Sequence, residues 1–179
     1  MSDYIFLLSS LPTPIWGEPA PISLEKFEET CRDHLTAEEF DALSRTRLDP
    51  PFNDIPHGLP EKFAAWDTCL RNALVPTLAE GRDVSAMLRP ETDCFSEIPA
   101  IAAAVVGAAT VLEAEKWLDT ARWEAVGFFT GCDVFTFDAV CAYKLKLLLI
   151  LKSDPRTPQR GSANLDRILA AVEQKNLQK

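Results

Sequence analysis

The segment FDAVCAYKLKLLLILK, residues 137–152, is apolar on nearly every face of a helix, and it constrains the fold more than any other feature of the chain. A helix of that kind must be covered on most of its surface by lipid, by the protein's own core or by a binding partner. A membrane-spanning helix needs about 20 mostly apolar residues, and Lys144, Lys146 and Lys152 interrupt this run. The sequence therefore favours a central core helix over direct insertion into a membrane.

Length and composition predict a helical domain that is large enough to fold unaided. The chain has 179 residues, of which 47% are hydrophobic, so it can build one core without disulfide or metal staples. We expect a single helical domain over residues 1–179. Two smaller lobes, 1–60 and 61–179, are the other arrangement that the length allows.

Charge is unevenly distributed along the chain, whose net charge is −9. Residues 1–135 carry 23 acidic and 10 basic side chains, whereas residues 136–179 carry 4 and 8. A general nucleic-acid binder relies on Lys and Arg to neutralise phosphates, so this balance argues against a nucleic-acid partner. Such a separation of charge orients association with a protein partner, but solvated helix faces produce charge runs as well.

Two helices are predicted in the first third of the chain. Leu24, Phe27 and Cys31 recur at helical spacing and define the apolar side of the first. Thr36 lies three residues ahead of Glu39, which is the spacing of a capping box at the start of the second. We expect these two segments to form a helix pair.

Longer helices are predicted in the middle of the chain. One begins at Pro60 and ends or kinks at Pro76. Its apolar stripe consists of Phe63, Trp66, Leu70 and Leu74. A short helix is expected around residues 84–88, and a further long helix from Pro99 to Trp117 or beyond.

The two ends of the chain complete the predicted fold. The run YIFLLSS, residues 4–10, fits either a strand or one buried helical turn, and we expect an extended segment. Near the other end, Asn164 is predicted to cap a last helix. Its amphipathic stripe consists of Leu165, Ile168, Leu169 and Val172. The predicted class is all-α, a compact multi-helix domain with at most one short N-terminal strand.

The cysteines predict neither a disulfide framework nor a zinc site. Five are present without a CxxC pair or a regular spacing: Cys31, Cys69, Cys94, Cys132 and Cys141. We expect reduced and mostly buried thiols, with Cys69 and Cys141 the least reactive because they lie within apolar helices. Cys132, in a loop, is expected to be the most exposed.

A search for catalytic constellations finds none. His34 and His57 are the only histidines, and neither lies in an HExxH or GxSxG context. No glycine-rich phosphate loop is present, and pairs of acidic residues are more often helix caps or solvated surface charges than catalytic groups. We therefore expect no catalytic residue, no cofactor and no metal, which means that the protein is not an enzyme. Trp16, in a Pro-rich loop, is the aromatic residue that we expect at an interface.

Three parts of the sequence resemble a known family. They are the opening YIFLLSSLP, the pair Arg71 and Asn72, and the run from Leu112 to Lys152. In that run the matching positions are Glu115, Leu118, Asp119, Arg122, Trp123, Asp138, Tyr143, Leu145 and Lys146. These residues resemble a bacterial family of unknown biochemical function that is encoded in V-type ATPase operons.

The resemblance implies a role in that ATPase. Such operons lack a recognisable gene for the C-type connector, called d in eukaryotes, which joins the central stalk to the membrane rotor ring. The family occupies the position of the missing connector gene in such operons and is similar to a shortened relative of that connector. The resemblance therefore implies a non-catalytic connector in the cytoplasm that reaches the inner membrane only through its partners. The alternatives are a helical adapter or assembly factor that is absent from the finished complex and, as a third hypothesis, a small enzyme.

Partner contacts are expected at six residues: Arg71, Asn72, Arg122, Trp123, Lys144 and Lys146. The predicted partners are the central stalk and the rotor ring, and the isolated protein is expected to be a monomer. We expect the helices from Pro99 and Asn164 to cover the 137–152 helix. Lys144 and Lys146 should then emerge at its rim beside Arg122 and Trp123.

Overall fold

The computed structural model describes residues 3–51, 53–79, 81–90, 95–132 and 134–153, and these residues form helices without any strand. The all-α class is therefore confirmed. The elements are α1 (Tyr4–Ser10), α2 (Leu24–His34), α3 (Ala37–Arg45), α4 (Leu59–Leu78), the 3₁₀-helix η1 (Ser85–Met87), α5 (Ile98–Val106), α6 (Val111–Thr130) and α7 (Phe137–Ser153). The predicted last helix from Asn164 lies outside the described residues.

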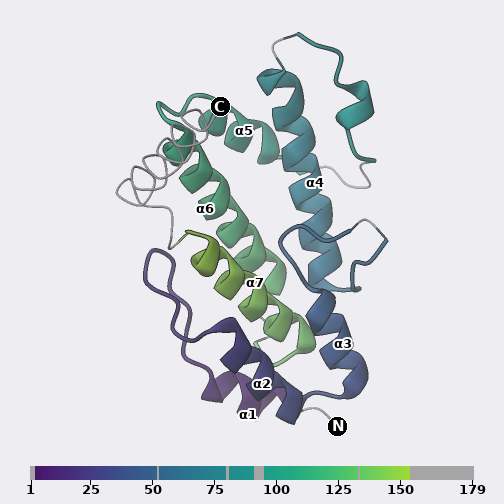
Figure 1. The fold of residues 1–179 in the computed structure, drawn as a ribbon, viewed down its shortest axis with the longest axis vertical. Helices are drawn as coiled ribbons and strands as arrows, with labels where there is room; N and C mark the ends of the chain where they lie inside the picture. Colours follow the sequence, from purple (N-terminus) through teal and green to yellow (C-terminus); the bar gives the residue numbers. More distant parts are fainter. Residues whose placement is uncertain (1–2, 52, 80, 91–94, 133, 154–179) are drawn as a thin grey trace, which may run out of the picture.

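The helices form an elongated body in which α4, α6 and α7 run along the long axis (Figure 1). Helix α6 runs antiparallel to both α4 and α7. Helices α1, α2 and α3 surround one end of this group, whereas α5 lies at the other end against α4 and α6. No helix among the described residues combines the length and apolarity needed to cross a membrane.

Helix α7 is the central element that its sequence predicts. Val140, Cys141, Leu145, Leu147 and Leu149 are fully buried along it. It is covered by α6 and α4 on one side and by α1, α2 and α3 on the other. The prediction that the helix from Pro99 chiefly covers α7 is wrong, because that helix, α5, packs mainly against α4 and α6.

Most buried hydrophobic side chains of the described residues fall into two clusters. The first joins α1, α2 and α3 to α7, and Phe63 of α4 and Val126 of α6 reach into it. The second lies between α4, α5 and α6 and includes Trp66 and Leu70. Since α4 and α6 contribute to both clusters, the two ends of the body share continuous helices.

Local sequence signals explain most helix starts. The predicted capping box is present, because the Thr36 hydroxyl accepts from the Glu39 amide and the Glu39 carboxylate accepts from the Thr36 amide. The expectation of an extended N-terminal segment is wrong. There the Asp3 carboxylate accepts from the Phe6 amide and starts a helix that buries Leu7.

The predicted helix from Pro99 to Trp117 is also wrong as one element. It divides into α5 and α6 at Gly107, whose amide bonds back to the carbonyl of Ala103. Helix α6 then begins anew, because the Thr110 hydroxyl accepts from the Glu113 amide. Pro76 does not end α4, which continues through it to Leu78.

Candidate functional site

Two helices of the body carry a pair of buried acidic residues that share one arginine. Asp67 of α4 and Asp119 of α6 are 4% and 2% exposed, and Arg122 of α6 lies between them. The Arg122 Nε donates to Asp67 Oδ1 at 2.8 Å, and its Nη1 donates to Asp119 Oδ1 at 3.1 Å. This arginine therefore links the two longest helices through charge-assisted hydrogen bonds.

Further cations complete an ion-pair network across α4, α6 and α7. The Arg71 Nε donates to the other oxygen of Asp67 at 2.5 Å. Lys152, at the end of α7, donates to Asp119 Oδ1 at 2.6 Å and lies 3.8 Å from Glu115. We call the set formed by Asp67, Arg71, Glu115, Asp119, Arg122 and Lys152 the charge network.

Burial and charge have opposite effects on the central arginine of this network. Burial alone would lower the pKa of Arg122, but the nearby charges of Asp67 and Asp119 and their hydrogen bonds raise it above its ordinary value. The guanidinium is therefore charged at neutral pH, as arginine side chains generally are. It acts as a fixed cation and not as a proton donor or acceptor.

A loop closes over one side of the charge network. The Asn72 side chain donates to the Arg89 carbonyl at 2.7 Å and accepts from the Arg89 amide at 3.0 Å. This pair of bonds fixes the segment that follows η1 against α4. The Arg89 side chain, which is 46% exposed, then lies 3.7 Å from Asp49, and Arg71 lies 3.4 Å from the same carboxylate.

An open cavity of about 410 Å³ lies above the charge network. The described residues that line it are Arg71, Asn72, Leu74, Val75, Met87, Arg89, Glu115, Leu118, Arg122 and Lys152. Four of them are cations and one is an acid, while the buried carboxylates of Asp67 and Asp119, which pair with three of these cations, are not part of the lining. Each cation of the lining therefore already has a carboxylate partner within the protein, and an anionic group of a binding partner would compete with these carboxylates.

Trp123 and Lys146, two other predicted contact residues, lie together at a separate place. The Lys146 ammonium lies 5.1 Å from the centroid of the Trp123 ring, which is within the range of a cation–π interaction. Burial lowers the pKa of Lys146. Trp16, which we expect at an interface, is partly buried: its ring lies 5.3 Å from Trp123 and its Nε1 donates to Thr120.

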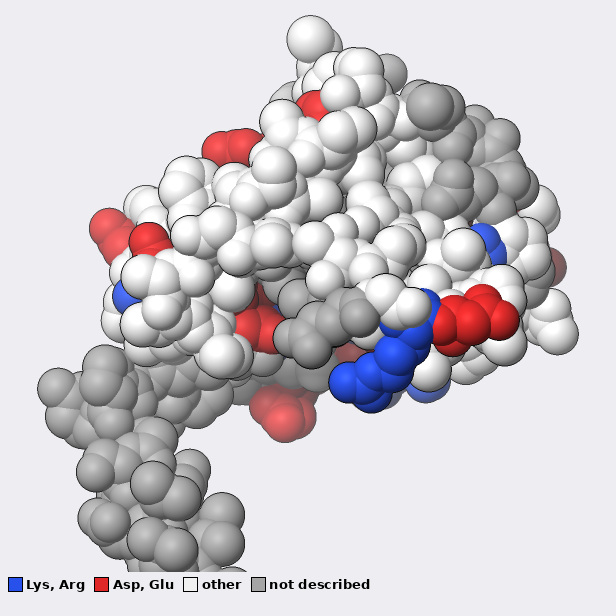
Figure 2. Space-filling model, turned by 90° about the horizontal axis from the view of Figure 1, so that it is seen from above, with Lys and Arg blue, Asp and Glu red and all other residues white. Residues whose placement is uncertain are grey.

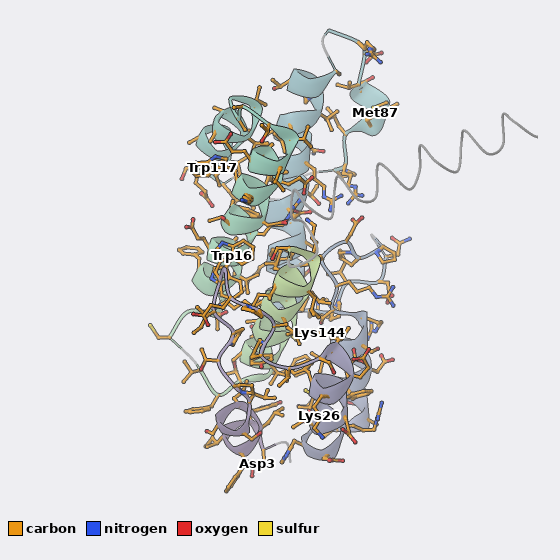
Figure 3. The ribbon with its side chains drawn as sticks, turned by 60° about the vertical axis from the view of Figure 1, so that its left-hand side comes forward. Asp3, Trp16, Lys26, Met87, Trp117 and Lys144 are labelled. Atoms are coloured by element: carbon orange, nitrogen blue, oxygen red, sulfur yellow. The ribbon has the colours of Figure 1, made fainter. Side chains whose placement is uncertain are left out.

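The predicted position of Lys144 at the rim of α7 is wrong. This side chain is 4% exposed and lies inside the molecule, as Figure 3 shows. Its ammonium donates to Glu28 at 3.0 Å and to the Leu43 carbonyl at 2.9 Å. Lys144 therefore holds α2 and α3 against α7 and presents no surface to a partner.

The described thiols agree with the predicted exposures. Cys31, Cys69 and Cys141 are buried, whereas Cys132 is exposed, and none of the four forms a disulfide. Burial raises the pKa of the Cys31 and Cys141 thiols to about 12. Cys94 lies outside the described residues.

Sequence reasoning found three members of the site, Arg71, Asn72 and Arg122, but missed Asp67, the acidic residue that joins the two arginines. The spacing of Asp67 four residues ahead of Arg71 is a signal of an ion pair on one helix face. No local pattern indicates that the same carboxylate meets Arg122, 55 positions later. Arg89 and Lys152 also reach the site through tertiary structure alone.

The side chains of this site pair acids with arginines and a lysine. Neither the charge network nor the lining of its cavity contains a histidine, a cysteine or a serine among the described residues. No group of acidic residues, histidines and cysteines suited to a metal ion occurs in the described part of the chain. Comparison with models of protein families, with curated proteins and with solved structures gave no match.

Proposed function

We propose that this chain is a non-catalytic accessory component of a V-type ATPase, a connector of the C or d type between the central stalk and the membrane rotor ring. The proposal starts from the resemblance of its sequence to a family encoded in V-type ATPase operons. One observation supports it most. Some residues that carry the resemblance lie far apart in the sequence but close together in the structure.

The contacts between these residues involve all three parts of the resemblance. Arg71 of α4 and Arg122 of α6 share Asp67 in the charge network. The Tyr143 hydroxyl of α7 donates to the carbonyl of Pro12, which ends the opening run, at 2.8 Å. The resemblance therefore covers residues that hold the helices of the body together. A body held together in this way suits a part that transmits force between partners.

The surface also offers places for partners to bind. Figure 2 views the end of the body where α4 finishes and α5 meets α6, and most of the surface visible there is uncharged. Exposed apolar side chains from this end include Met87, Leu88, Val106 and Val111. Exposed apolar surface beside a cavity lined by cations is typical of a protein-binding region. Among the predicted contact residues, Arg71, Asn72 and Arg122 line that cavity, and Lys146 with Trp123 forms a second contact region.

The test is purification of the tagged chain from its native host at its native level of expression. We expect the stalk and rotor-ring proteins of the ATPase to co-purify in a fixed ratio with the assembled enzyme. A matched pair of variants links this result to the cavity. Arg89→Glu reverses a cation of the lining and should weaken co-purification, whereas Arg82→Glu reverses an exposed cation outside the lining and should leave it unchanged.

The alternative role, an adapter or assembly factor, gives a different result in the same experiment. In that case the chain is found with partly assembled ATPase and is missing from the finished enzyme. Purification with no ATPase protein, or a gene located among unrelated metabolic genes, contradicts both roles. Those outcomes would favour the third hypothesis, a small enzyme.

A further inference from the structure

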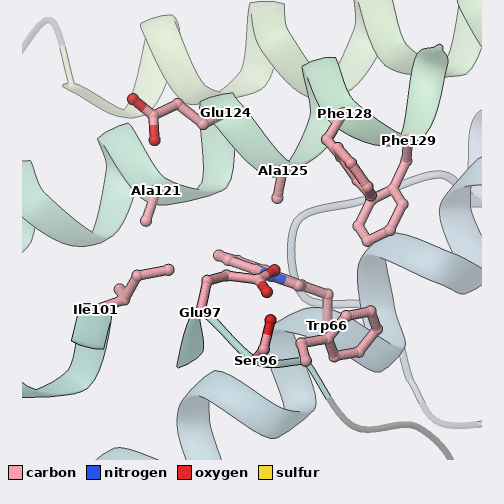
Figure 4. A pocket seen from close by; sticks show the side chains of 10 residues that line it. Trp66, Ser96, Glu97, Ile101, Ala121, Glu124, Ala125, Phe128 and Phe129 are labelled. Carbon is pink, nitrogen blue, oxygen red and sulfur yellow. The ribbon is translucent and has the colours of Figure 1, made fainter. Parts of the chain in front are cut away.

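A second cavity, of about 520 Å³, lies between α4, α5 and α6, away from the charge network (Figure 4). Its lining consists of Trp66, Phe95, Ser96, Glu97, Ile101, Ala121, Glu124, Ala125, Phe128 and Phe129. Four of these ten residues are aromatic and two are acidic, and the described lining contains no lysine or arginine. We call it the aromatic cavity.

Three of the four aromatic side chains are in contact with one another. Phe129 lies edge-on to Phe95 at 6.0 Å and to Phe128 at 5.5 Å between ring centroids. On the α4 side of the cavity, Trp66 is 1% exposed, whereas Phe128, on the α6 side, is 80% exposed. The faces of such rings carry negative electrostatic potential and attract cations.

The exposed side chain of Glu97 lines the cavity and lies against Trp66. Figure 4 shows it beside the Trp66 indole, facing the side from which Ala121 and Ala125 point into the cavity. One oxygen, Glu97 Oε1, accepts from Trp66 Nε1 at 3.0 Å. This hydrogen bond holds the side chain in place beside the cavity. The Glu124 carboxylate points away from Trp66 and Glu97 in the same view.

We propose that the aromatic cavity binds an organic cation, an ammonium or guanidinium group on an apolar body, with the charge against Glu97 and the body between the aromatic rings. Aromatic rings that line the same cavity as a carboxylate are suited to such a group, because cation–π attraction and an ion pair act on the same charge. The small side chains of Ala121 and Ala125 leave the space for the apolar body. The same chemistry is found in a basic side chain of a protein partner and in a small organic amine.

The first test uses three probes that share one apolar body and differ in charge: 3-phenylpropylammonium, 3-phenylpropanol and 3-phenylpropionate. Each is titrated into the full-length, ¹⁵N-labelled protein, and the indole N–H resonance of Trp66 is followed, with Trp66→Phe identifying it. We expect the ammonium to shift this resonance and to bind about fivefold more tightly than the alcohol, and the carboxylate to bind most weakly. Equal affinity for ammonium and alcohol, or shifts that spare Trp66, would overturn the proposal.

Two matched variants locate the charge that is recognised. Glu97→Gln removes the charge but retains an oxygen that can accept from Trp66 Nε1, so the fold should persist and the preference for ammonium should disappear. Glu38→Gln makes the same chemical change on an exposed carboxylate of α3, outside the lining of the cavity, and it should retain the preference. The proposal fails if the preference survives Glu97→Gln, or if Glu38→Gln removes it as well.

A peptide arm distinguishes the two sources of the cation. The blocked peptides acetyl-Leu-Lys-Leu-amide and acetyl-Leu-norleucine-Leu-amide differ only in the ammonium group. Tighter binding of the lysine peptide than of 3-phenylpropylammonium assigns the cavity to a partner side chain, and the reverse order assigns it to a small amine. If the norleucine peptide binds as tightly as the lysine peptide, the cavity does not recognise a cation. None of these results depends on an association with the ATPase.

Discussion

Arg122 pairs with two carboxylates that have almost no contact with solvent, and its removal leaves Arg71 beside Asp67 and Lys152 beside Asp119. We expect Arg122→Leu to lower the free energy of unfolding by about 3 kcal/mol, the lower end of the usual effect of breaking a buried ion pair from one side, because each carboxylate keeps a second cation. Urea unfolding followed by circular dichroism measures this change.

Arg45 supplies the control for that prediction. It also pairs with two carboxylates, Asp41 and Asp54, but all three side chains are more than a third exposed. Arg45→Leu should therefore change the free energy of unfolding by about 1 kcal/mol or less. Similar losses for Arg122→Leu and Arg45→Leu would mean that the charge network contributes no more than surface pairs do.

The buried thiols predict a loss of stability at high pH. An unfolded thiol loses its proton near pH 8.5, whereas the folded pKa of Cys31 and Cys141 is raised to about 12. Between these values the unfolded state binds fewer protons than the folded state, so the free energy of unfolding falls as pH rises. At pH 10 the loss should be on the order of 2 kcal/mol for each thiol.

Urea unfolding at pH 7.5 and pH 10 checks this prediction. The double variant Cys31→Ala, Cys141→Ala should lose less stability between the two pH values than the unchanged protein does. Cys132→Ala removes an exposed thiol and should show the same alkaline loss as the unchanged protein. An identical loss in the double variant would assign the effect to other groups, such as Tyr143, whose pKa burial also raises to about 12.

At the scale of the elements, α7 should be the helix most sensitive to truncation of a side chain. Leu147 is fully buried in the first hydrophobic cluster. Leu147→Ala should lower the free energy of unfolding of the isolated protein by about 2 to 5 kcal/mol. Leu148, the next residue on the same helix, is only partly buried and supplies the control, since Leu148→Ala should cost clearly less. If Leu147→Ala left stability unchanged but abolished co-purification with the ATPase stalk, α7 would be an interface element.

The elements that sequence predicts well are those whose own residues determine them. The capping box at Thr36, the start of α7 after Thr136 and the apolar stripe through Trp66 all depend on neighbours within one or two helical turns. The errors occur where local signals compete. Gly107 and Thr110 divide one apolar segment into two helices, because each supplies a helix end that periodicity alone does not reveal.

The residues of the candidate site are predicted less well, because the site is assembled from distant segments. Lys144 and Lys146 are two positions apart on α7, yet one is buried against Glu28 and the other lies over the Trp123 ring. Only the surrounding helices distinguish them. Likewise, Asp67 gains its role from Arg122 on another helix, so no spacing along α4 indicates more than its pair with Arg71.

On the scale of the whole molecule, α4 and α6 make the two hydrophobic clusters dependent on each other. Along α4, Phe63 belongs to the first cluster and Leu70 to the second. Along α6, Val126 and Ala125 belong to different clusters although they are adjacent. The charge network adds a third connection between these helices, through Asp67 and Arg122.

This connection predicts a single cooperative unfolding transition for the described body, because neither cluster can lose its packing without disturbing helices that the other needs. Leu70→Ala in the second cluster and Leu147→Ala in the first should each lower the midpoint of the same transition. Calorimetry, circular dichroism and tryptophan fluorescence should give coincident curves for both variants and for the unchanged protein. Two separated transitions, each displaced by only one of the substitutions, would show that the ends of the body unfold independently and that α4 and α6 do not couple them.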